Sequence, residues 1–269
     1  MRYFIHLSYK GTSFKGWQMQ KDVTTVQAVL EDAMSRLLKT SIKVTGCGRT
    51  DSGVHASQYF AHFNFEENLS DKTIFRLNKI LPKSIRIHDI IEVNKSAHAR
   101  YHAISRSYKY FWHTEQTAFI DEYSSLYEEK VYDFKKMAEA VKLIADQKDF
   151  KPLCKSPDKH DSTLCLIQSI SLKTNKYKNQ FCFEITANRF VRGMIRNIVS
   201  RLLQVGLGEI ELEHLKEVLD MNHEETLPVP AHPQGLFLTE IKYKNIDCKV
   251  KTQPFVFLLH QESDGWVTL

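Results

Sequence analysis

The N-terminal part of the chain alternates between segments with the hydrophobic period of a strand and segments with the period of a helix. Over residues 2–9 every second residue is large and apolar, which predicts a half-buried strand. Over residues 26–38 apolar residues recur at the spacing i, i+3, i+4, i+7, which predicts an amphipathic helix. Thr24 is the expected first residue of this helix, and Gln27 completes a capping-box pattern with it. A chain that alternates in this way is typical of a sheet covered by helices.

The same analysis of hydrophobic periodicity predicts elements along the rest of the chain. In the first half it predicts strands at 42–47, 59–65, 85–93 and 104–112, and a short helix capped by Ser70 and stopped by Pro82. In the second half it predicts helices at 133–145, 190–205 and 211–220, and strands at 164–173, 180–188, 236–243 and 254–259. We therefore expect an α+β fold made of two ferredoxin-like (RRM-like) halves, 1–112 and 113–269, that share a mostly antiparallel central sheet.

Composition excludes several classes of protein. No apolar run approaches the roughly 18 residues of a membrane span, and the N-terminus lacks the apolar core of a signal peptide, so a cytoplasmic protein is expected. The number of cysteines is odd and no Cys-x-x-Cys occurs, which disfavours a disulfide framework and a cysteine zinc site. The five cysteines are expected to be buried free thiols, namely Cys47, Cys154, Cys165, Cys182 and Cys248.

Charge is unevenly distributed along the sequence. The net charge is only +5, with a pI near 8.8. Residues 71–109 nevertheless contain nine Lys/Arg and three acids, and residues 189–201 contain four arginines and no acid. Residues 209–225 are acidic. This segregation suits a nucleic-acid surface on one side of the molecule.

The segment Gly46–Ala56 holds the densest group of residues that carry chemistry. Arg49 and Asp51 are two residues apart, so in extended backbone their side chains project to the same side. An arginine beside an aspartate favours the ionised carboxylate, which can act as a nucleophile at carbon. The alternative is a surface turn with an incidental ion pair, and the residues by themselves leave both interpretations open.

His98 and His102 are four residues apart and raise the question of a metal site. The zincin motif requires a glutamate directly after the first histidine on a helix. Here Ala99 follows His98, and the segment is predicted to be extended. We therefore expect no metal, and a metal-dependent hydrolase is disfavoured.

Six blocks of sequence resemble one known family. Gly48–Ala56 resembles the catalytic motif of the bacterial tRNA pseudouridine synthase A family. The other blocks resemble further signatures of that family in the same order, namely Tyr9–Gln20, Leu81–Ile85, His98–Arg100 with Arg106–Tyr110, Arg189–Val199 and Gly235–Leu238. They span nearly the whole chain. Residues 229–234 depart from the family pattern, because this approach to Gly235 is longer and richer in proline.

The resemblance implies a pseudouridine synthase fold and an enzyme that isomerises uridine to pseudouridine at positions 38, 39 and 40 in the anticodon stem-loop of tRNAs. It implies no cofactor and a homodimer with one tRNA lying across both subunits. A catalytically silent RNA-binding protein on the same fold is the alternative. The intact Arg49-Thr50-Asp51 argues against it, since a carboxylate beside phosphates does not help binding.

The resemblance also implies roles for individual residues. Asp51 begins glycosidic cleavage as the nucleophile, with attack at C1′, attack at C6 and a glycal route all left open. Arg49 keeps Asp51 ionised and fills the gap that the flipped base leaves. Tyr108 stacks on the target base or relays a proton, and Leu236 packs against that base. Arg196 is expected to lie near the catalytic carboxylate. It is also one of four arginines expected to contact substrate RNA, namely Arg196, Arg192, Arg189 and Arg106.

Overall fold

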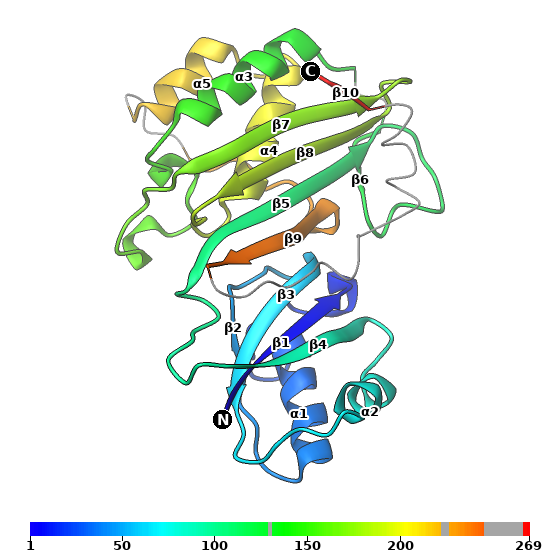
Figure 1. Cartoon of the computed structure of the whole chain (residues 1–269). Helices are drawn as coiled ribbons and strands as arrows, with labels where there is room; N and C mark the ends of the chain where they lie inside the picture. The colour runs from blue at the N-terminus through cyan, green and yellow to red at the C-terminus, as the bar shows by residue number, and fades with distance from the viewer. Residues whose placement is uncertain (129–130, 222–225, 245–265) are drawn as a thin grey trace. The chain divides into compact units, whose positions relative to one another are not determined.

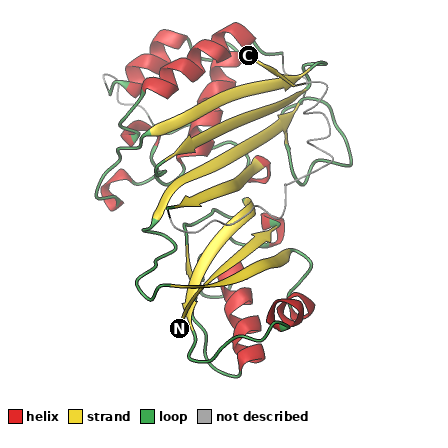
Figure 2. Ribbon diagram, in the orientation of Figure 1, coloured by secondary structure: helices red, strands yellow, loops and turns green. Residues whose placement is uncertain are grey.

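The computed structural model describes residues 1–128, 131–221, 226–244 and 266–269. These residues form two compact units, the first made of Met1–Ile104 with 237–244 and the second of Ser105–Leu236 with 266–269. The chain passes from the first unit to the second within one strand and returns within another. Helices and strands occur in both units (Figure 2). The functional division into halves 1–112 and 113–269 stays a prediction.

The first unit is a sheet with two helices (Figure 1). Its strands are β1 (Arg2–Tyr9), β2 (Thr45–Gly46), β3 (His55–Asn64), β4 (Ile85–Val93) and the part of β9 (Leu236–Tyr243) from Phe237 on. They are joined in the order β4-β1-β3-β9, and β2 also pairs with β3. All pairs are antiparallel except β3 with β9. Helix α2 (Thr73–Ile80) lies against β4, and α1 (Val26–Leu38) lies against α2.

Strand β1 is more buried than its alternation predicts. Both of its faces are covered, since Phe4 and His6 are as buried as the residues that alternate with them. Phe4 packs edge-on against Tyr243, with ring centroids 5.3 Å apart, and His6 stacks on Phe60 at 4.8 Å. The prediction of a half-buried strand is wrong because aromatic residues that are distant in sequence cover the second face.

Helix α1 spans the predicted residues but begins with a different cap. The Oγ1 of Thr25, not of Thr24, accepts a hydrogen bond from the Ala28 N–H at 3.3 Å. The capping-box prediction is therefore wrong. Gln27 instead donates through Nε2 to Glu31 Oε1 at 2.9 Å and to the Val44 carbonyl at 3.1 Å. Its amide ties the helix to the next segment rather than to the helix end.

Strand β2 is shorter than the predicted strand over 42–47. The Ile42 N–H donates to the Ser35 hydroxyl at 2.9 Å, and the Val44 N–H donates to Glu31 Oε1 at 3.0 Å. Side chains of α1 thus take the hydrogen bonds that a neighbouring strand would otherwise make. Only Thr45 and Gly46 pair with β3.

The second unit also consists of strands and helices, with α3 packed on its strand β7 (Figure 1). Its strands are β5 (Ala103–His113, within this unit from Ser105), β6 (Ser125–Leu126), β7 (Ile167–Asn175), β8 (Gln180–Ala187) and β10 (Trp266–Thr268). The order is β10-β7-β8-β5, antiparallel throughout, and β6 pairs with β5 in parallel. The helices are α3 (Phe134–Asp146), α4 (Met194–Gly206) and α5 (Leu212–Leu219), which contact one another, and α3 also contacts β7.

Helix α4 begins four residues later than the sequence predicts. Gly193 is its N-cap and has φ of +76°, a conformation that glycine adopts without steric cost. Residues 189–192 therefore precede the helix, so Arg192 lies outside it although the predicted helix 190–205 includes that residue. The apolar residues along the helix from Ile195 to Val205 are buried.

The fold class is confirmed as α+β with a mostly antiparallel arrangement of strands. The predicted helix at 133–145 corresponds to α3, and Asp133 caps it by accepting from the Lys136 N–H at 3.0 Å. The ferredoxin-like character of the two halves stays a prediction, and the predicted strand at 254–259 lies outside the described residues. Within the described parts of the chain, no helix combines the length and apolarity needed to cross a membrane.

Candidate active site

The aspartate loop, residues 47–54, connects β2 to β3 and carries both Arg49 and Asp51. It closes with a turn in which the Asp51 carbonyl accepts from the Val54 N–H at 3.2 Å. Gly53 has φ of +80°, the left-handed conformation that such a turn requires. Asp51 is half-buried and Arg49 is exposed. The loop thus combines a backbone turn with an exposed Arg49 and a partly accessible Asp51.

The segment between β1 and α1 holds the aspartate loop in place. The Trp17 N–H donates to the Thr50 carbonyl at 3.2 Å, and the Phe14 carbonyl accepts from the Gly53 N–H at 3.3 Å. Gly11 lies so close to the loop that a Cβ there would be 2.0 Å from the Val54 carbonyl oxygen. This explains why the block Tyr9–Gln20 accompanies the block Gly48–Ala56, since one packs on the other.

Three buried aromatic residues lie under the aspartate loop. The rings of Trp17 and Tyr59 stack with centroids 4.0 Å apart, and Tyr9 lies edge-on to Tyr59 at 5.5 Å. The Tyr59 hydroxyl donates to the Gly48 carbonyl at 2.5 Å, and the Tyr9 hydroxyl shares a 2.9 Å hydrogen bond with Thr50 Oγ1. Sequence reasoning gave these three residues no role. Their one signal was the presence of two of them in a block that carries the family resemblance.

Arg49 has no hydrogen-bond or ion-pair partner among the described residues. Its exposed guanidinium is therefore open to a ligand. The predicted electrostatic support of Asp51 by Arg49 stays a prediction.

In the second unit the structure brings Arg106, Tyr108 and the segment before α4 together. Arg106 Nη1 donates to the Asn188 carbonyl at 3.3 Å. The half-buried Tyr108 ring packs edge-on against Phe190, with centroids 5.0 Å apart. The Arg189 N–H donates to Asn188 Oδ1 at 2.8 Å. These contacts place one arginine of β5 beside the start of the arginine-rich segment.

Arg196 contacts the proline-rich loop 229–234. Its Nε donates to the Ala231 carbonyl at 2.6 Å, and its own carbonyl accepts from the Ala231 N–H at 3.2 Å. The Tyr127 hydroxyl accepts from the His232 N–H at 3.3 Å. Burial raises the pKa of Tyr127 and of Tyr110 beside it, so both hydroxyls stay protonated at neutral pH. The loop that departs from the family pattern is thus tied to α4 and to a tyrosine pair.

The remaining predicted residues differ in exposure. Arg192 is exposed, and its carbonyl accepts from the Lys155 N–H at 2.7 Å. Leu236 is buried at the start of β9. Arg201, the last arginine of the 189–201 run, is 2% exposed and donates to Gln204 Oε1 at 3.1 Å. Arg201 therefore does not belong to a basic surface.

The His98 and His102 rings hold the backbone of a turn. His98 Nδ1 accepts from the Arg100 and Tyr101 N–H groups at 3.2 and 3.3 Å, and His102 Nδ1 accepts from the His98 N–H at 3.3 Å. Those lone pairs are directed at backbone donors. In the described parts of the chain, no three His, Cys, Asp or Glu side chains group in a way that could hold a metal ion.

The cysteines agree with the prediction of buried free thiols where the structure describes them. Cys47, Cys154, Cys165 and Cys182 are buried thiols outside any disulfide, and Cys248 lies outside the described residues. Burial raises the pKa of the Cys154 thiol and raises that of Cys165 to about 11. Thiols with raised pKa values are poor nucleophiles at neutral pH.

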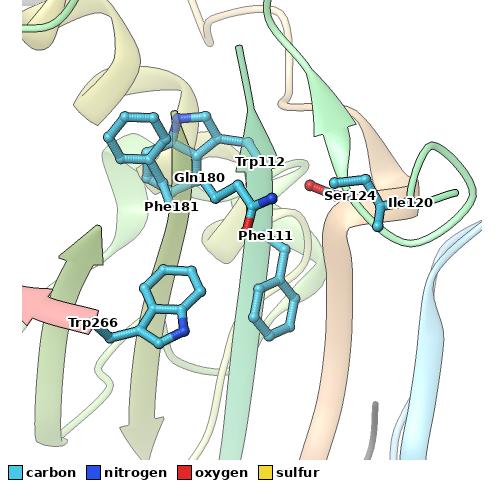
Figure 3. A pocket seen from close by; sticks show the side chains of 7 residues that line it. All are labelled: Phe111, Trp112, Ile120, Ser124, Gln180, Phe181 and Trp266. Atoms are coloured by element: carbon cyan, nitrogen blue, oxygen red, sulfur yellow. The ribbon is translucent and has the colours of Figure 1, made fainter. Parts of the chain in front are cut away.

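A small pocket in the second unit contains none of the predicted site residues (Figure 3). Its lining is largely aromatic and consists of Phe111, Trp112, Ile120, Ser124, Gln180, Phe181 and Trp266. No side chain in that lining is a carboxylate, an imidazole, a thiol or a cation. The lining offers neither a nucleophile for carbon nor a cation for phosphate, so we do not place the active site there.

Comparison with known proteins gives consistent matches. A family model described as tRNA pseudouridine synthase matches residues 140–244. The chain is 37% identical to the tRNA pseudouridine synthase A of Azobacteroides pseudotrichonymphae over 247 residues, which are 91% of this chain and 97% of that protein. It is 37% identical to the protein of the same name from Parabacteroides distasonis over 246 residues, which are 90% and 96% of the two chains.

The α+β fold and these matches define an enzyme of the pseudouridine synthase class, an isomerase. The residues matched by the family model include the segment 189–196 and Leu236, and the longer pairwise matches cover about nine tenths of the chain. The chain belongs to the tRNA pseudouridine synthase A family.

Proposed function

We propose that the protein isomerises uridine to pseudouridine at positions 38, 39 and 40 in the anticodon stem-loop of tRNAs, with Asp51 as the nucleophile. The broader part of this statement, isomerisation of uridine in tRNA, follows from membership of the family. The observation that best supports the role of Asp51 is the construction of the aspartate loop. Its backbone is held by the segment 11–17, while the Asp51 side chain is half-buried and the neighbouring Arg49 is open to a ligand.

The chemistry requires the target uridine to leave the helical stack. A paired and stacked base cannot turn about its glycosidic bond, so the nucleotide must be flipped out. The bond between N1 of uracil and C1′ of ribose then breaks, the base turns, and a bond from C5 to C1′ forms while the C5 hydrogen leaves as a proton and N1 takes up a proton. No electrons are gained or lost overall, and no cofactor is required. Attack at C1′, attack at C6 and elimination through a glycal are all compatible with one carboxylate.

Arg49 and Tyr108 are proposed to act on the flipped nucleotide. A planar guanidinium keeps a carboxylate ionised and can occupy the space left in the stack, which a lysine cannot do as well. Tyr108 offers a half-exposed ring braced by Phe190 for stacking on the base, an interaction worth about 1–3 kcal/mol. Leu236 is proposed to pack against the same base.

Basic residues of both units are proposed to bind RNA phosphates. In the second unit these are Arg106, Arg189, Arg192 and Arg196. In the first unit the solvent-facing cations around α2 and β4 are candidates, namely Lys79, Lys83 and Arg86. We also propose a homodimer, which brings two such sets of cations to one tRNA, and a cytoplasmic location.

Replacement of Asp51 by asparagine tests the proposal. The assay is release of tritium from tRNA that carries [5-³H]uridine, because only bond formation at C5 expels that label. Asp51→Asn keeps the shape of the side chain and removes its negative charge, so tritium release should be abolished while tRNA affinity stays nearly unchanged. Asp22→Asn is a matched control, because Asp22 is exposed and has φ of +61°, which asparagine tolerates.

Two outcomes would contradict the proposal. An Asp51→Asn variant with activity within tenfold of wild type would remove Asp51 from the role of nucleophile. A wild-type protein that binds tRNA but releases no tritium would favour the catalytically silent RNA-binding alternative.

A further inference from the structure

We propose that the hydroxyl groups of Tyr59 and Tyr9 are positioning groups for uridine isomerisation, because Tyr59 holds the carbonyl of the residue before Arg49 and Tyr9 holds the side chain of the residue after it. The inference rests on the proposed function and assigns a part of the catalytic machinery that lies beneath the reacting residues. Neither tyrosine is inferred to touch the substrate, since Tyr59 is 0% exposed and Tyr9 is 5% exposed.

The two hydroxyls contact the residues directly before and after Arg49. The Tyr59 hydroxyl donates to the carbonyl of Gly48 at 2.5 Å. The Tyr9 hydroxyl and Thr50 Oγ1 are 2.9 Å apart. The peptide group between Gly48 and Arg49 makes a single hydrogen bond within the described residues. In that bond the Gly48 carbonyl accepts from the Tyr59 hydroxyl. A single side chain therefore restrains the peptide that precedes the arginine.

The tyrosine rings are themselves held firmly. Tyr59 is stacked on Trp17 with an interplanar angle of 28°, and Tyr9 contacts both of these rings. A rigid ring places its hydroxyl at one point, so the carbonyl that accepts from it is fixed as well. The Arg49 side chain makes no hydrogen bond or ion pair within the described residues, so its direction depends on the position of its backbone.

Rigid support of this kind matters because catalysis is sensitive to small displacements. A shift of about 1 Å in a catalytic group can lower a rate on the order of a hundredfold. Asp51 follows Thr50 directly, and the Thr50 carbonyl also accepts from the Trp17 N–H at 3.2 Å. The hydroxyl of Tyr9 thus acts on the residue between Arg49 and Asp51, and the loss of either hydroxyl is expected to reduce the rate of the chemical step.

Phenylalanine variants remove the hydroxyls and keep the rings. We expect Tyr59→Phe and Tyr9→Phe each to lower the single-turnover rate of tritium release at saturating tRNA by about tenfold. The Kd for tRNA should change less than about twofold, because the substitutions remove no contact with RNA. If the hydroxyls served only to stabilise the fold, the variants would have a lower Tm and a smaller active fraction. Their rate would then not fall independently of their affinity for tRNA.

Tyr3→Phe is the matched control. Tyr3 is 5% exposed, lies on the same strand as Tyr9, stacks on Phe63 at 5.5 Å and donates its hydroxyl to the Glu67 carbonyl at 3.2 Å. The Tyr3→Phe variant therefore loses an equivalent buried hydroxyl, but one that does not contact the aspartate loop. Its Tm should fall as much as that of Tyr59→Phe, while its rate of tritium release stays at the wild-type value.

A double-mutant cycle gives an independent readout. Thr50→Val removes the other partner of the Tyr9 hydrogen bond without changing the shape of the side chain. If both groups act through that bond, the rate of Tyr9→Phe/Thr50→Val equals that of either single variant, whereas independent effects would multiply. This cycle tests the part assigned to Tyr9 even if Tyr59→Phe fails to fold.

The outcomes distinguish this inference from the proposed function. A wild-type protein without tritium release overturns both. An active wild type whose Tyr59→Phe variant matches Tyr3→Phe in rate, or loses only tRNA affinity, overturns the positioning role and leaves the proposed function standing. Multiplied rate losses in the Tyr9–Thr50 cycle overturn the part assigned to Tyr9.

Discussion

Replacing Gly11 by alanine should move the aspartate loop, and the size of the movement follows from the structure. The added Cβ would lie 2.0 Å from the carbonyl oxygen of Val54 and 2.5 Å from its carbonyl carbon. Contacts of Cβ atoms below 3.0 Å essentially never occur, so the backbone must separate by about 1 Å. The obstructing atoms are backbone atoms, which cannot rotate away as a side chain does.

Both stability and activity should respond. Overpacking of this kind costs about 2 kcal/mol, which lowers Tm by roughly 4–8 °C in a chain of this size. A shift of about 1 Å in the loop that carries Asp51 should lower the single-turnover rate of tritium release on the order of a hundredfold. The affinity for tRNA should change much less, because Gly11 is buried beneath the loop.

Thermal unfolding and tritium release on the same preparations test this prediction. Gly48→Ala is the control for stability, because a Cβ at Gly48 would meet no atom within 4 Å, and its Tm should equal that of wild type. A Gly11→Ala protein with the wild-type rate would refute the reasoning that the position of this loop limits catalysis. Equal Tm values for both variants would show that the close approach at Gly11 is relieved without cost.

Three further perturbations test other parts of the argument. Arg49→Lys should lose at least about nine tenths of the rate of tritium release, because a point charge does not replace a planar guanidinium, and a fully active variant would show that charge alone matters. Binding of tRNA should weaken by roughly a thousandfold or more between 50 and 200 mM salt, and sedimentation should show a dimer without RNA; an active monomer or a salt-independent Kd would contradict the shared basic surface. Burial lowers the pKa of His62 to about 4 in the folded chain. As pH falls from 6.5 towards 4, His62 therefore takes up a proton in the unfolded chain but not in the folded chain. The free energy of unfolding decreases over that pH range. His62→Asn, which keeps an acceptor for the Ala99 N–H, should lose less Tm than wild type between pH 7 and pH 5, and an equal loss would assign the acid sensitivity to other groups.

Elements whose signals are local could be predicted closely. Strands β1, β4 and β9 have the bounds that alternation and turn residues indicate, and Asp133 caps α3 as its position before an amphipathic run predicts. Each of these signals is contained in about ten consecutive residues. The helical periodicity of the run from Phe190 predicts a start of helix α4 that is too early, because the left-handed backbone conformation of Gly193 sets the true start.

The sequence by itself determined the alternation of strands and helices. Its six ordered blocks also indicated the family and identified Arg49 and Asp51 as candidate catalytic residues. It could not determine how the aspartate loop is held. The atoms that hold it come from Gly11, Trp17 and Tyr59, and their contacts depend on distances between segments that the sequence does not contain. The tertiary structure alone decided these contacts, because a hydrogen bond or a steric limit exists only once packing has brought its two partners within a few ångströms.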